Sequence, residues 1–190
     1  MAAKDIRRFL LVGIVLPFLG LELRGDIDPQ NMSRDEMVKA AEGLIITNYY
    51  VNRWLRAPDI KGQSLDGKDA ELIPKPGFVD VHFFLASWCI PCQRLTKKIK
   101  SIVAHYAPYN VRFNFIFAHD RAEDAGLFAK AYSIDHGILA NAQILKNFHN
   151  PPLPTIYMSD KNGWFLSRYV NPSDADLKNF DNLLDKLVTF

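Results

Sequence analysis

Cysteine is scarce in this chain, since only Cys89 and Cys92 occur among its 190 residues. A structural zinc site needs four ligands, so histidines would have to supply the remaining two. The five histidines are scattered along the chain and form no His-x3–5-His pair. A zinc site is therefore disfavoured, and we predict neither a metal nor another cofactor.

The chain also lacks a strong net charge, a repeat and a low-complexity tract. Its formal net charge is +2 and no basic run stands out, so nucleic acid is not a predicted partner. Its hydrophobic content of 48% favours a packed core over a disordered chain. At this length we expect one domain with an appendage.

Long hydrophobic runs are missing as well. A transmembrane helix needs about 20 apolar residues. The apolar stretch 9–21 is shorter, is interrupted by Pro17 and is followed by Glu22. Three basic residues precede it, and its length matches the ~7–15 residues typical of a signal-peptide hydrophobic region. The stretch is therefore interpreted as an export signal or a short anchor.

Residues 1–24 are predicted to be a signal peptide or a signal anchor. No Ala-x-Ala-like cleavage site follows the apolar stretch, so a retained membrane tether through residues 6–21 stays open. A buried amphipathic start of the domain is the alternative. Both membrane interpretations place the rest of the chain outside the cytoplasm, in the periplasm if the source is Gram-negative.

Residues 25–77 are predicted to be a helical extension and a linker. Ser33 and Glu36 form a Ser-x-x-Glu capping box, and a helix is expected from there to about Arg56. The segment 59–77 contains three glycines and two prolines, which favours a loop, with a short strand expected near residues 71–73.

The two cysteines lie where a strand is predicted to end and a helix to begin. Residues 78–86 form an apolar run rich in Val and Phe, which is typical of a buried strand. Apolar side chains then recur at spacings of three and four, as in an amphipathic helix: Cys92, Leu95, Ile99, Ile102 and Val103. Because residues three apart share a helix face, the two sulfurs should lie within bonding distance.

Cys89 is the predicted nucleophile. The unpaired N–H groups and the positive dipole end at a helix N-terminus favour a thiolate over a thiol. A Cys-x-x-Cys thiol in this position commonly has its pKa lowered to ~3.5–7.5. Cys92 is then the resolving thiol, which displaces the partner from a mixed disulfide. Pro91 suits the first helical turn, where its missing N–H costs nothing.

Two other interpretations of the cysteine pair stay open. The pair could be an inert structural disulfide, although a three-residue step closes almost no loop and so constrains the unfolded chain little. The domain could also keep the pair while acting mainly as a binding module. Thiol–disulfide exchange is the favoured interpretation.

The segment 86–92, Ala-Ser-Trp-Cys-Ile-Pro-Cys, resembles the active-site motif of the thioredoxin superfamily, Trp-Cys-x-Pro-Cys after a core strand. A second motif, Leu153-Pro154-Thr155 before an apolar run, resembles the cis-proline loop of that family. Without the family resemblance, the bond between Leu153 and Pro154 would be expected to be trans, because only ~5–6% of X-Pro bonds are cis. The resemblance spans roughly residues 77–190.

The resemblance implies roles for particular residues. In this family the cis-proline packs against the active-site disulfide, and the residue before it helps to bind the substrate backbone. Carried over, these roles fall on Pro154 and Leu153. The implied substrate-binding residues around the two motifs are Trp88, Ile90, Pro91, Leu153, Pro154 and Thr155. The implied partners are cysteine-containing proteins, namely a substrate and a thiol donor or acceptor.

The remaining pattern favours an α/β thioredoxin-like fold over residues 78–190, with a central mixed sheet flanked by helices. The N-terminal helical extension precedes it, and an extra helix is expected before the cis-proline loop. The expected elements are a strand at 111–118, a helix at 124–132, a hairpin around Asn162-Gly163 with a returning strand at 164–170, and a last helix capped by Ser173.

The extra helix lies within residues 133–153, where thioredoxin has only a short connection. Its candidate apolar residues are Ile138, Ala142, Ile144, Leu145 and Phe148. Active sites of open α/β sheets lie beyond the carboxyl ends of the strands. The insertion is therefore expected either to border the cysteine site and shape the substrate surface or to extend the core.

The resemblance implies a thiol–disulfide oxidoreductase. Thioredoxin carries a buried carboxylate six residues before the nucleophile, and this chain has Phe83 there, with His82 expected on the opposite strand face. Exported, membrane-tethered bacterial reductases are the most similar group, so we expect a reductant. The alternatives are a periplasmic disulfide oxidase or isomerase, and a thioredoxin-fold scaffold component of a secretion or conjugation apparatus.

Overall fold

A computed structural model describes residues 56–189. The predicted signal segment, including the tether at residues 6–21, and the helix expected from Ser33 therefore lie outside the described residues. Within 56–189, none of the helices combines the length and the apolar character that crossing a bilayer requires.

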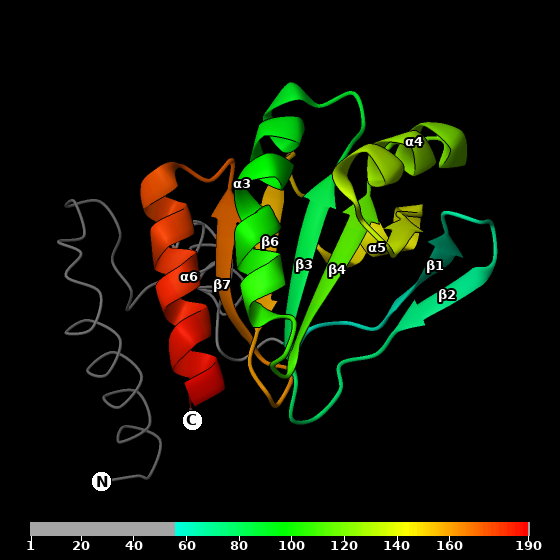
Figure 1. Ribbon diagram of the computed structural model, residues 1–190. Coiled ribbons are helices and arrows are strands. Elements are labelled where there is room, and N and C mark those ends of the chain that lie inside the picture. The colour runs from blue at the N-terminus through cyan, green and yellow to red at the C-terminus, as the bar shows by residue number, and fades with distance from the viewer. Residues whose placement is uncertain (1–55, 190) are drawn as a thin grey trace, which may run out of the picture. The chain divides into compact units, whose positions relative to one another are not determined.

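The described residues are built on one mixed sheet of seven strands, in the order β2-β1-β5-β4-β3-β6-β7 (Figure 1). The strands are β1 (Ile60–Ser64), β2 (Asp69–Leu72), β3 (Val79–Leu85), β4 (Val111–Phe117), β5 (Gly137–Leu139), β6 (Thr155–Ser159) and β7 (Phe165–Val170). Strands β3, β4 and β5 run parallel, and β6 is antiparallel to β3. The central mixed sheet predicted from the sequence is confirmed.

Within residues 56–189, four helices flank this sheet: α3 (Ile90–Tyr106), α4 (Ala122–Tyr132), α5 (Ala142–Asn147) and α6 (Asp174–Thr189). Figure 1 shows α3 and α6 side by side across one face. The strand before the cysteines, the helix after them and the later elements lie within a few residues of their predicted bounds. The order β3-α3-β4-α4, followed by β6-β7-α6, is that of the predicted thioredoxin-like fold.

Strand β3 separates two hydrophobic cores, because all seven of its residues are buried. The first core cluster lies on the α3 face and includes Val81, Phe83, Cys89, Cys92, Leu95, Phe115, Met158 and Phe180. The second core cluster lies on the opposite face and includes Phe84, Ile116, Ile138, Ile144, Leu145, Phe148, Tyr157 and Phe165. Neighbouring strand residues point to opposite faces, so Phe83 and Phe84 belong to different clusters.

The turn between β6 and β7 and the cap at the start of α6 form as the sequence predicted. Gly163 adopts a positive φ of 80° in the turn between β6 and β7. The N–H of Gly163 also donates to the carbonyl of Asp160, at 2.9 Å. At the start of α6, the Ser173 hydroxyl accepts a hydrogen bond from the Asp176 N–H, and the Asp176 carboxylate accepts one from the Ser173 N–H. This reciprocal pairing gives hydrogen-bond acceptors to two N–H groups that have no acceptor within the helix.

The segment 59–77 is not the loop that its glycines and prolines predicted. It forms the antiparallel pair β1–β2, and β1 also pairs antiparallel with β5, so residues assigned to the linker extend the same sheet. The short strand expected near residues 71–73 corresponds to β2. Gly62 is required inside β1 rather than marking a loop: an added Cβ would lie 2.9 Å from Cγ2 of Ile138 and 2.9 Å from the Leu139 carbonyl oxygen.

The insertion before the cis-proline loop was predicted as one helix and is a strand followed by a short helix. Ile138 lies in β5, parallel to β4, whereas Ile144 and Leu145 lie in α5. The apolar spacing of the segment fits a helix, but pairing with β4 takes its first residues into the sheet. The side chain of Asn141 accepts a hydrogen bond from the Ile144 N–H and so begins α5 after the strand.

A buried polar network lies on the second-cluster side of β3. The Arg112 guanidinium donates two hydrogen bonds of 2.6 Å to the Asp80 carboxylate. Asn114 links Asp80 to His82, with its amide nitrogen 3.4 Å from the carboxylate and 3.3 Å from the His82 Nδ1. The His82 ring packs edge-on against Phe148. Burial lowers the pKa of His82 to about 4. The negative charge of Asp80 opposes this shift, and the positive charge of Arg112 adds to it.

We expect His82 to make the stability of the protein depend on pH. Its pKa is about 4 in the folded protein and ~6.5 in the unfolded chain, so only the unfolded chain gains this proton between those values. Its stabilising contribution is complete above pH ~6.5 and is lost as the pH falls toward 4, by roughly 3 kcal/mol. Chemical denaturation across this range should show a steeper fall for wild type than for His82→Gln.

The matched control is His136→Gln, because His136 is exposed. The stability of this variant should fall with pH as steeply as that of wild type. The ring signals of His82 provide a second measurement that needs no variant, and they should not titrate between pH 5 and 8. A His82→Gln slope equal to that of wild type, or a ring that titrates near pH 6.5, would contradict this assignment.

Candidate active site

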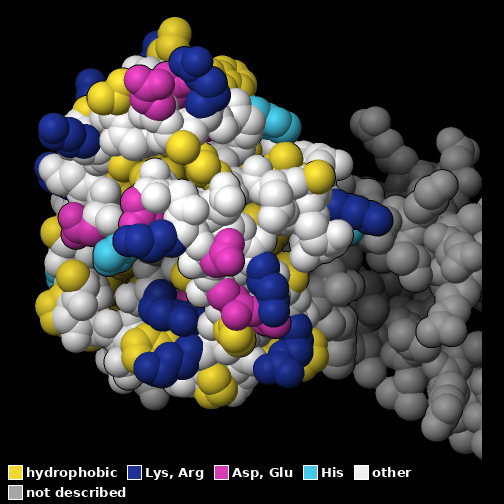
Figure 2. All heavy atoms as spheres, turned by 90° about the vertical axis from the view of Figure 1, so that its right-hand side faces the viewer, with side chains coloured by type: hydrophobic (Ala, Val, Ile, Leu, Met, Phe, Trp, Pro, Cys, Tyr) yellow, Lys and Arg dark blue, Asp and Glu magenta, His cyan; other side chains and the backbone are white. Residues whose placement is uncertain are grey.

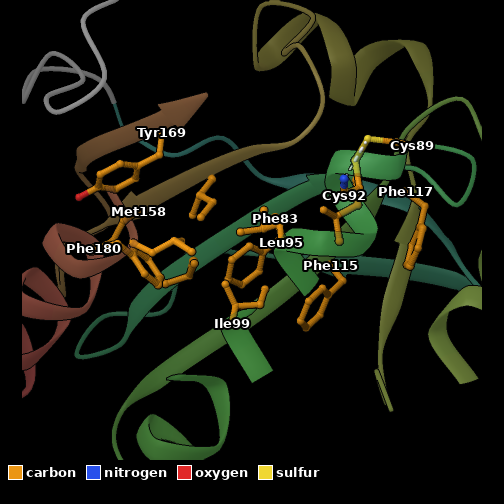
Figure 3. Close-up of a cluster of buried hydrophobic side chains, with 14 of the residues drawn as sticks. Phe83, Cys89, Cys92, Leu95, Ile99, Phe115, Phe117, Met158, Tyr169 and Phe180 are labelled. Atoms are coloured by element: carbon orange, nitrogen blue, oxygen red, sulfur yellow. Dashed lines mark hydrogen bonds between the residues drawn. A yellow bond between two sulfur atoms is a disulfide. The ribbon is translucent and has the colours of Figure 1, made fainter. Parts of the chain in front are cut away.

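The two cysteines lie where β3 ends and α3 begins, as the sequence predicted. Cys89 is the N-cap of α3, with extended backbone angles, and Cys92 lies in the first helical turn. Their sulfurs are joined in a disulfide, and their Cα atoms are 5.2 Å apart (Figure 3). The Cys92 N–H donates a hydrogen bond to the Cys89 sulfur at 3.2 Å. A cysteine sulfur therefore occupies the place that a serine or aspartate oxygen fills in an ordinary helix cap.

This position favours negative charge on the Cys89 sulfur once the disulfide is reduced. The first amide groups of a helix have no partner within the helix, and the helix dipole has its positive end there. Both effects stabilise a thiolate relative to a thiol. There is also no acidic residue in the first turn of α3 to oppose them.

The two cysteines differ in their access to solvent. Cys89 is 6% exposed and Cys92 is fully buried, and both belong to the first core cluster. Two large apolar side chains beside Cys89 are exposed, Trp88 at 63% and Ile90 at 59%. Pro91 is exposed as well. The reactive pair thus lies under a small apolar surface, which a partner protein could cover.

The cis-proline loop has the predicted geometry, because the Leu153–Pro154 peptide bond is cis. Thr155 pairs with Phe84 across β3 and β6, so the loop lies at the end of the sheet where β3 leads to the cysteines. Leu153 is half-buried and packs against both core clusters, including the one that contains the disulfide. Pro154 is buried.

Thr155 is fully buried, and its hydroxyl donates a hydrogen bond of 2.5 Å to the carbonyl of Pro152. Thr155, paired with Phe84 and Val170 in the sheet, therefore offers a partner no exposed surface in this structure. The implied substrate surface is thus exposed at Trp88, Ile90 and Pro91 and half-buried at Leu153.

Phe83 occupies the strand position where thioredoxin has a carboxylate. Its ring stacks on Phe115 at 5.1 Å between centroids, within the first core cluster. His82 points to the other face, as predicted from strand alternation. Two acidic residues are buried within 56–189, and both are engaged elsewhere: Asp80 with Arg112, and Asp176 with Ser173.

The structure adds a carboxylate that the sequence did not indicate. Asp120 lies just after β4, and its side chain accepts hydrogen bonds from the N–H and the hydroxyl of Ser87, at 2.7 and 2.6 Å. On the other side, the Gln93 amide donates to the Ser87 carbonyl. Asp120 is 33 residues from Ser87 and belongs to no local motif. Only the parallel pairing of β3 with β4 could have suggested that their following loops meet.

The inserted helix α5 contributes to the core. Its buried residues Ile144 and Leu145 belong to the second core cluster, whereas the cysteines belong to the first. Of the two expected roles for the insertion, the structure therefore shows the extension of the core. Within 56–189, no group of three or more His, Cys, Asp or Glu side chains is arranged to hold a metal ion.

Comparison with known proteins gives related proteins but no family model that matches the chain. It is similar to the thiol-disulfide oxidoreductase ResA of Geobacillus thermodenitrificans, with 26% identity over 109 residues, which cover 56% of this chain and 63% of that protein. The ResA protein of Geobacillus kaustophilus is 25% identical over 126 residues, which cover 63% and 72%. The chain thus matches less than two thirds of the first relative's length.

Solved structures share the fold. The thioredoxin domain of a thiol-disulfide oxidoreductase from Bacteroides vulgatus superposes with a TM-score of 0.62 and 18% identity, covering 73% of this chain and 99% of that one. A thiol:disulfide interchange protein of the thioredoxin family from Chlorobium tepidum gives a TM-score of 0.61 and 22% identity, covering 70% and 95%. The predicted thioredoxin-like fold is confirmed.

We expect the reduced protein to be alkylated at Cys89 well before Cys92. Cys89 keeps 6% of its surface exposed and lies at the helix N-terminus, whereas Cys92 is fully buried. Limited iodoacetamide labelling at pH 7, read by mass spectrometry of the peptides, should favour Cys89 by about tenfold or more. The variants Cys89→Ser and Cys92→Ser give the rate of each thiol alone. Equal rates, or faster labelling of Cys92, would contradict the assignment of Cys89 as nucleophile.

Proposed function

We propose that this member of the thioredoxin superfamily is a thiol–disulfide oxidoreductase that exchanges the Cys89–Cys92 dithiol and disulfide with cysteines of partner proteins. The observation that carries the proposal is the position of the pair. The Cys89 sulfur lies at the N-terminus of α3, is hydrogen-bonded by the Cys92 amide and is bonded to the Cys92 sulfur. The similar proteins and structures are a thiol-disulfide oxidoreductase and a thiol:disulfide interchange protein, which belong to the same class of reaction.

The exchange proceeds in two displacements. The Cys89 thiolate attacks one sulfur of a partner disulfide, which forms a mixed disulfide and releases the other partner sulfur as a thiolate. The Cys92 thiolate then attacks the Cys89 sulfur, which forms the Cys89–Cys92 disulfide and releases the second partner sulfur. Two electrons pass to the partner, and its two thiolates take up the protons that left Cys89 and Cys92. A second, external dithiol must then reduce the pair by the same steps in reverse.

The proposed direction is reduction of the partner. The resemblance of the segment 86–92 to exported bacterial reductases supports this direction. Phe83 lies where thioredoxin has the carboxylate that helps to deprotonate the resolving thiol, so attack by Cys92 has no such aid. We therefore propose a reductant of particular partner proteins, recharged by a thiol donor, rather than a fast, general reductant of proteins.

We propose that the reaction takes place outside the cytoplasm. The support comes from the sequence, where a basic start and the apolar stretch 9–21 resemble an export signal or anchor. Residues 6–21 would then be the tether to the inner membrane if the segment is retained. Periplasmic fractionation of the native chain, with and without residues 1–24, tests this placement.

The loss of Cys89 and the loss of Cys92 should have different effects. Cys89→Ser should abolish reduction of insulin by the protein with dithiothreitol, because the attacking sulfur is gone. Cys92→Ser should leave covalent adducts between Cys89 and partner proteins in cells, since nothing resolves the mixed disulfide. These adducts, separated on non-reducing gels and identified by mass spectrometry, would name the partners.

The control for the trapping experiment is the Cys89→Ser/Cys92→Ser double variant, which should carry no adducts. Full exchange activity in Cys89→Ser would refute the mechanism. A wild-type disulfide that resists dithiothreitol and exchanges with no partner would support the structural-disulfide scaffold instead.

The reduction potential distinguishes a reductant from an oxidase. Proteins of this kind range from ~−270 mV for thioredoxin to ~−120 mV for the strongest oxidant, a span of about 7 kcal/mol. Equilibration with glutathione buffers, followed by quantification of the thiols, should place the Cys89–Cys92 couple in the more reducing half of that range. A value near ~−120 mV would support the alternative of a periplasmic oxidase or isomerase.

A further inference from the structure

The backbone that leads into Cys89 is held by a carboxylate from another strand. One oxygen of Asp120 accepts the Ser87 N–H at 2.7 Å, and the other accepts the Ser87 hydroxyl at 2.6 Å. Strands β3 and β4 are parallel neighbours, with Leu85 opposite Phe117, so the loops that follow them emerge at the same end of the sheet. Asp120 therefore ties the loop after β4 to the loop after β3.

Further contacts hold the same short loop. The carbonyl of Ser87 accepts a hydrogen bond of 3.1 Å from the Gln93 amide in α3, and the Trp88 indole N–H donates to the His119 carbonyl at 3.4 Å. The N–H, the hydroxyl and the carbonyl of Ser87 thus all have partners. Only Trp88 lies between Ser87 and Cys89, so the position of the Cys89 sulfur over the helix depends on where Ser87 is held.

Among the described residues, the side chain of Asp120 hydrogen-bonds only to Ser87. The structure gives it no ion pair among the described residues, and its neighbour Arg121 pairs with Asp124 at 2.7 Å. Both of its oxygens are used on Ser87. Hydrogen bonds to a charged acceptor are about twice as strong as neutral ones, which suits a contact that fixes a loop.

We infer that Asp120 is a positioning residue for the reactive thiol. By holding Ser87, it keeps the Cys89 sulfur at the N-terminus of α3, where the Cys92 amide and the helix dipole stabilise the thiolate. This inference rests on the proposed function and adds a residue from outside both active-site motifs. It implies that the loop after β4 controls how readily Cys89 ionises.

The charge of Asp120 and its hydrogen bonds act on Cys89 in opposite directions. A nearby negative charge disfavours a thiolate, so the charge alone would raise the pKa of Cys89. The hydrogen bonds place the sulfur at the helix N-terminus and would lower that pKa. Two substitutions separate these effects. Asp120→Asn removes the charge but keeps a carbonyl that can accept the Ser87 N–H and an amide that can donate to its hydroxyl, whereas Asp120→Ala removes both.

The test is the pKa of Cys89 in the reduced full chain, measured from the pH dependence of alkylation at Cys89 by mass spectrometry. Asp120→Ala should raise this pKa by roughly one unit, which lowers the thiolate fraction about tenfold below the pKa. Asp120→Asn should leave it at or below the wild-type value. Ser87→Ala keeps the backbone contact and should give an intermediate rise, which also covers the case in which Asp120→Ala fails to fold.

The matched control is Asp124→Ala, which removes a nearby carboxylate that pairs with Arg121 and not with Ser87. Its Cys89 pKa should equal that of wild type. The inference is overturned if Asp120→Ala and Ser87→Ala lower the pKa of Cys89 or leave it unchanged. A lower melting temperature with an unchanged Cys89 pKa also overturns it. The proposed function is tested separately by exchange with a disulfide, since a protein could show this pattern of pKa values and still reduce no partner.

Discussion

The chemistry proposed for this protein depends on one hydrogen bond, from the amide of Cys92 to the sulfur of Cys89. It requires that Cys89 end an extended segment and cap a helix at the same time, and β3 and α3 meet these two requirements. Burial of all seven residues of β3 fixes where the strand ends, and the apolar side of α3 fixes how the helix lies on the sheet. The reactivity of the sulfur is therefore a consequence of how the core packs.

The two faces of the sheet have different roles. The α3 face is almost wholly apolar and holds the disulfide, so the environment around Cys92 contains aromatic and aliphatic side chains, with Phe83 among them. The other face holds the ion pair of Asp80 with Arg112 and the neutral His82. Because β3 lies between the two, charges buried on one face are kept away from the thiols on the other.

The sequence was most informative where a local pattern determines local structure. The position of the cysteines and the strand face on which His82 lies follow from residues close in the chain, whereas the cis bond before Pro154 was expected from the family resemblance. The β1–β2 pair was missed because the glycines and prolines of 59–77 indicate a loop, while its pairing with β5 depends on residues some 75 positions away. Asp120 was missed for the same reason, since its contact with Ser87 exists only once β3 and β4 are side by side.

The antiparallel pair β1–β2 has a consequence for solubility. Without it, β5 would present an open strand edge, and such edges recruit strands from other molecules. The pair closes this edge and replaces it with β2, a strand of four residues whose outward side chains are Asp69 and Glu71. Glu71 pairs with Lys61, and acidic and basic side chains lie near one another on this face of the described residues (Figure 2). A short, charged border is poorly suited to pairing with strands of other molecules, so this edge of the sheet is less prone to aggregation than a longer apolar edge would be.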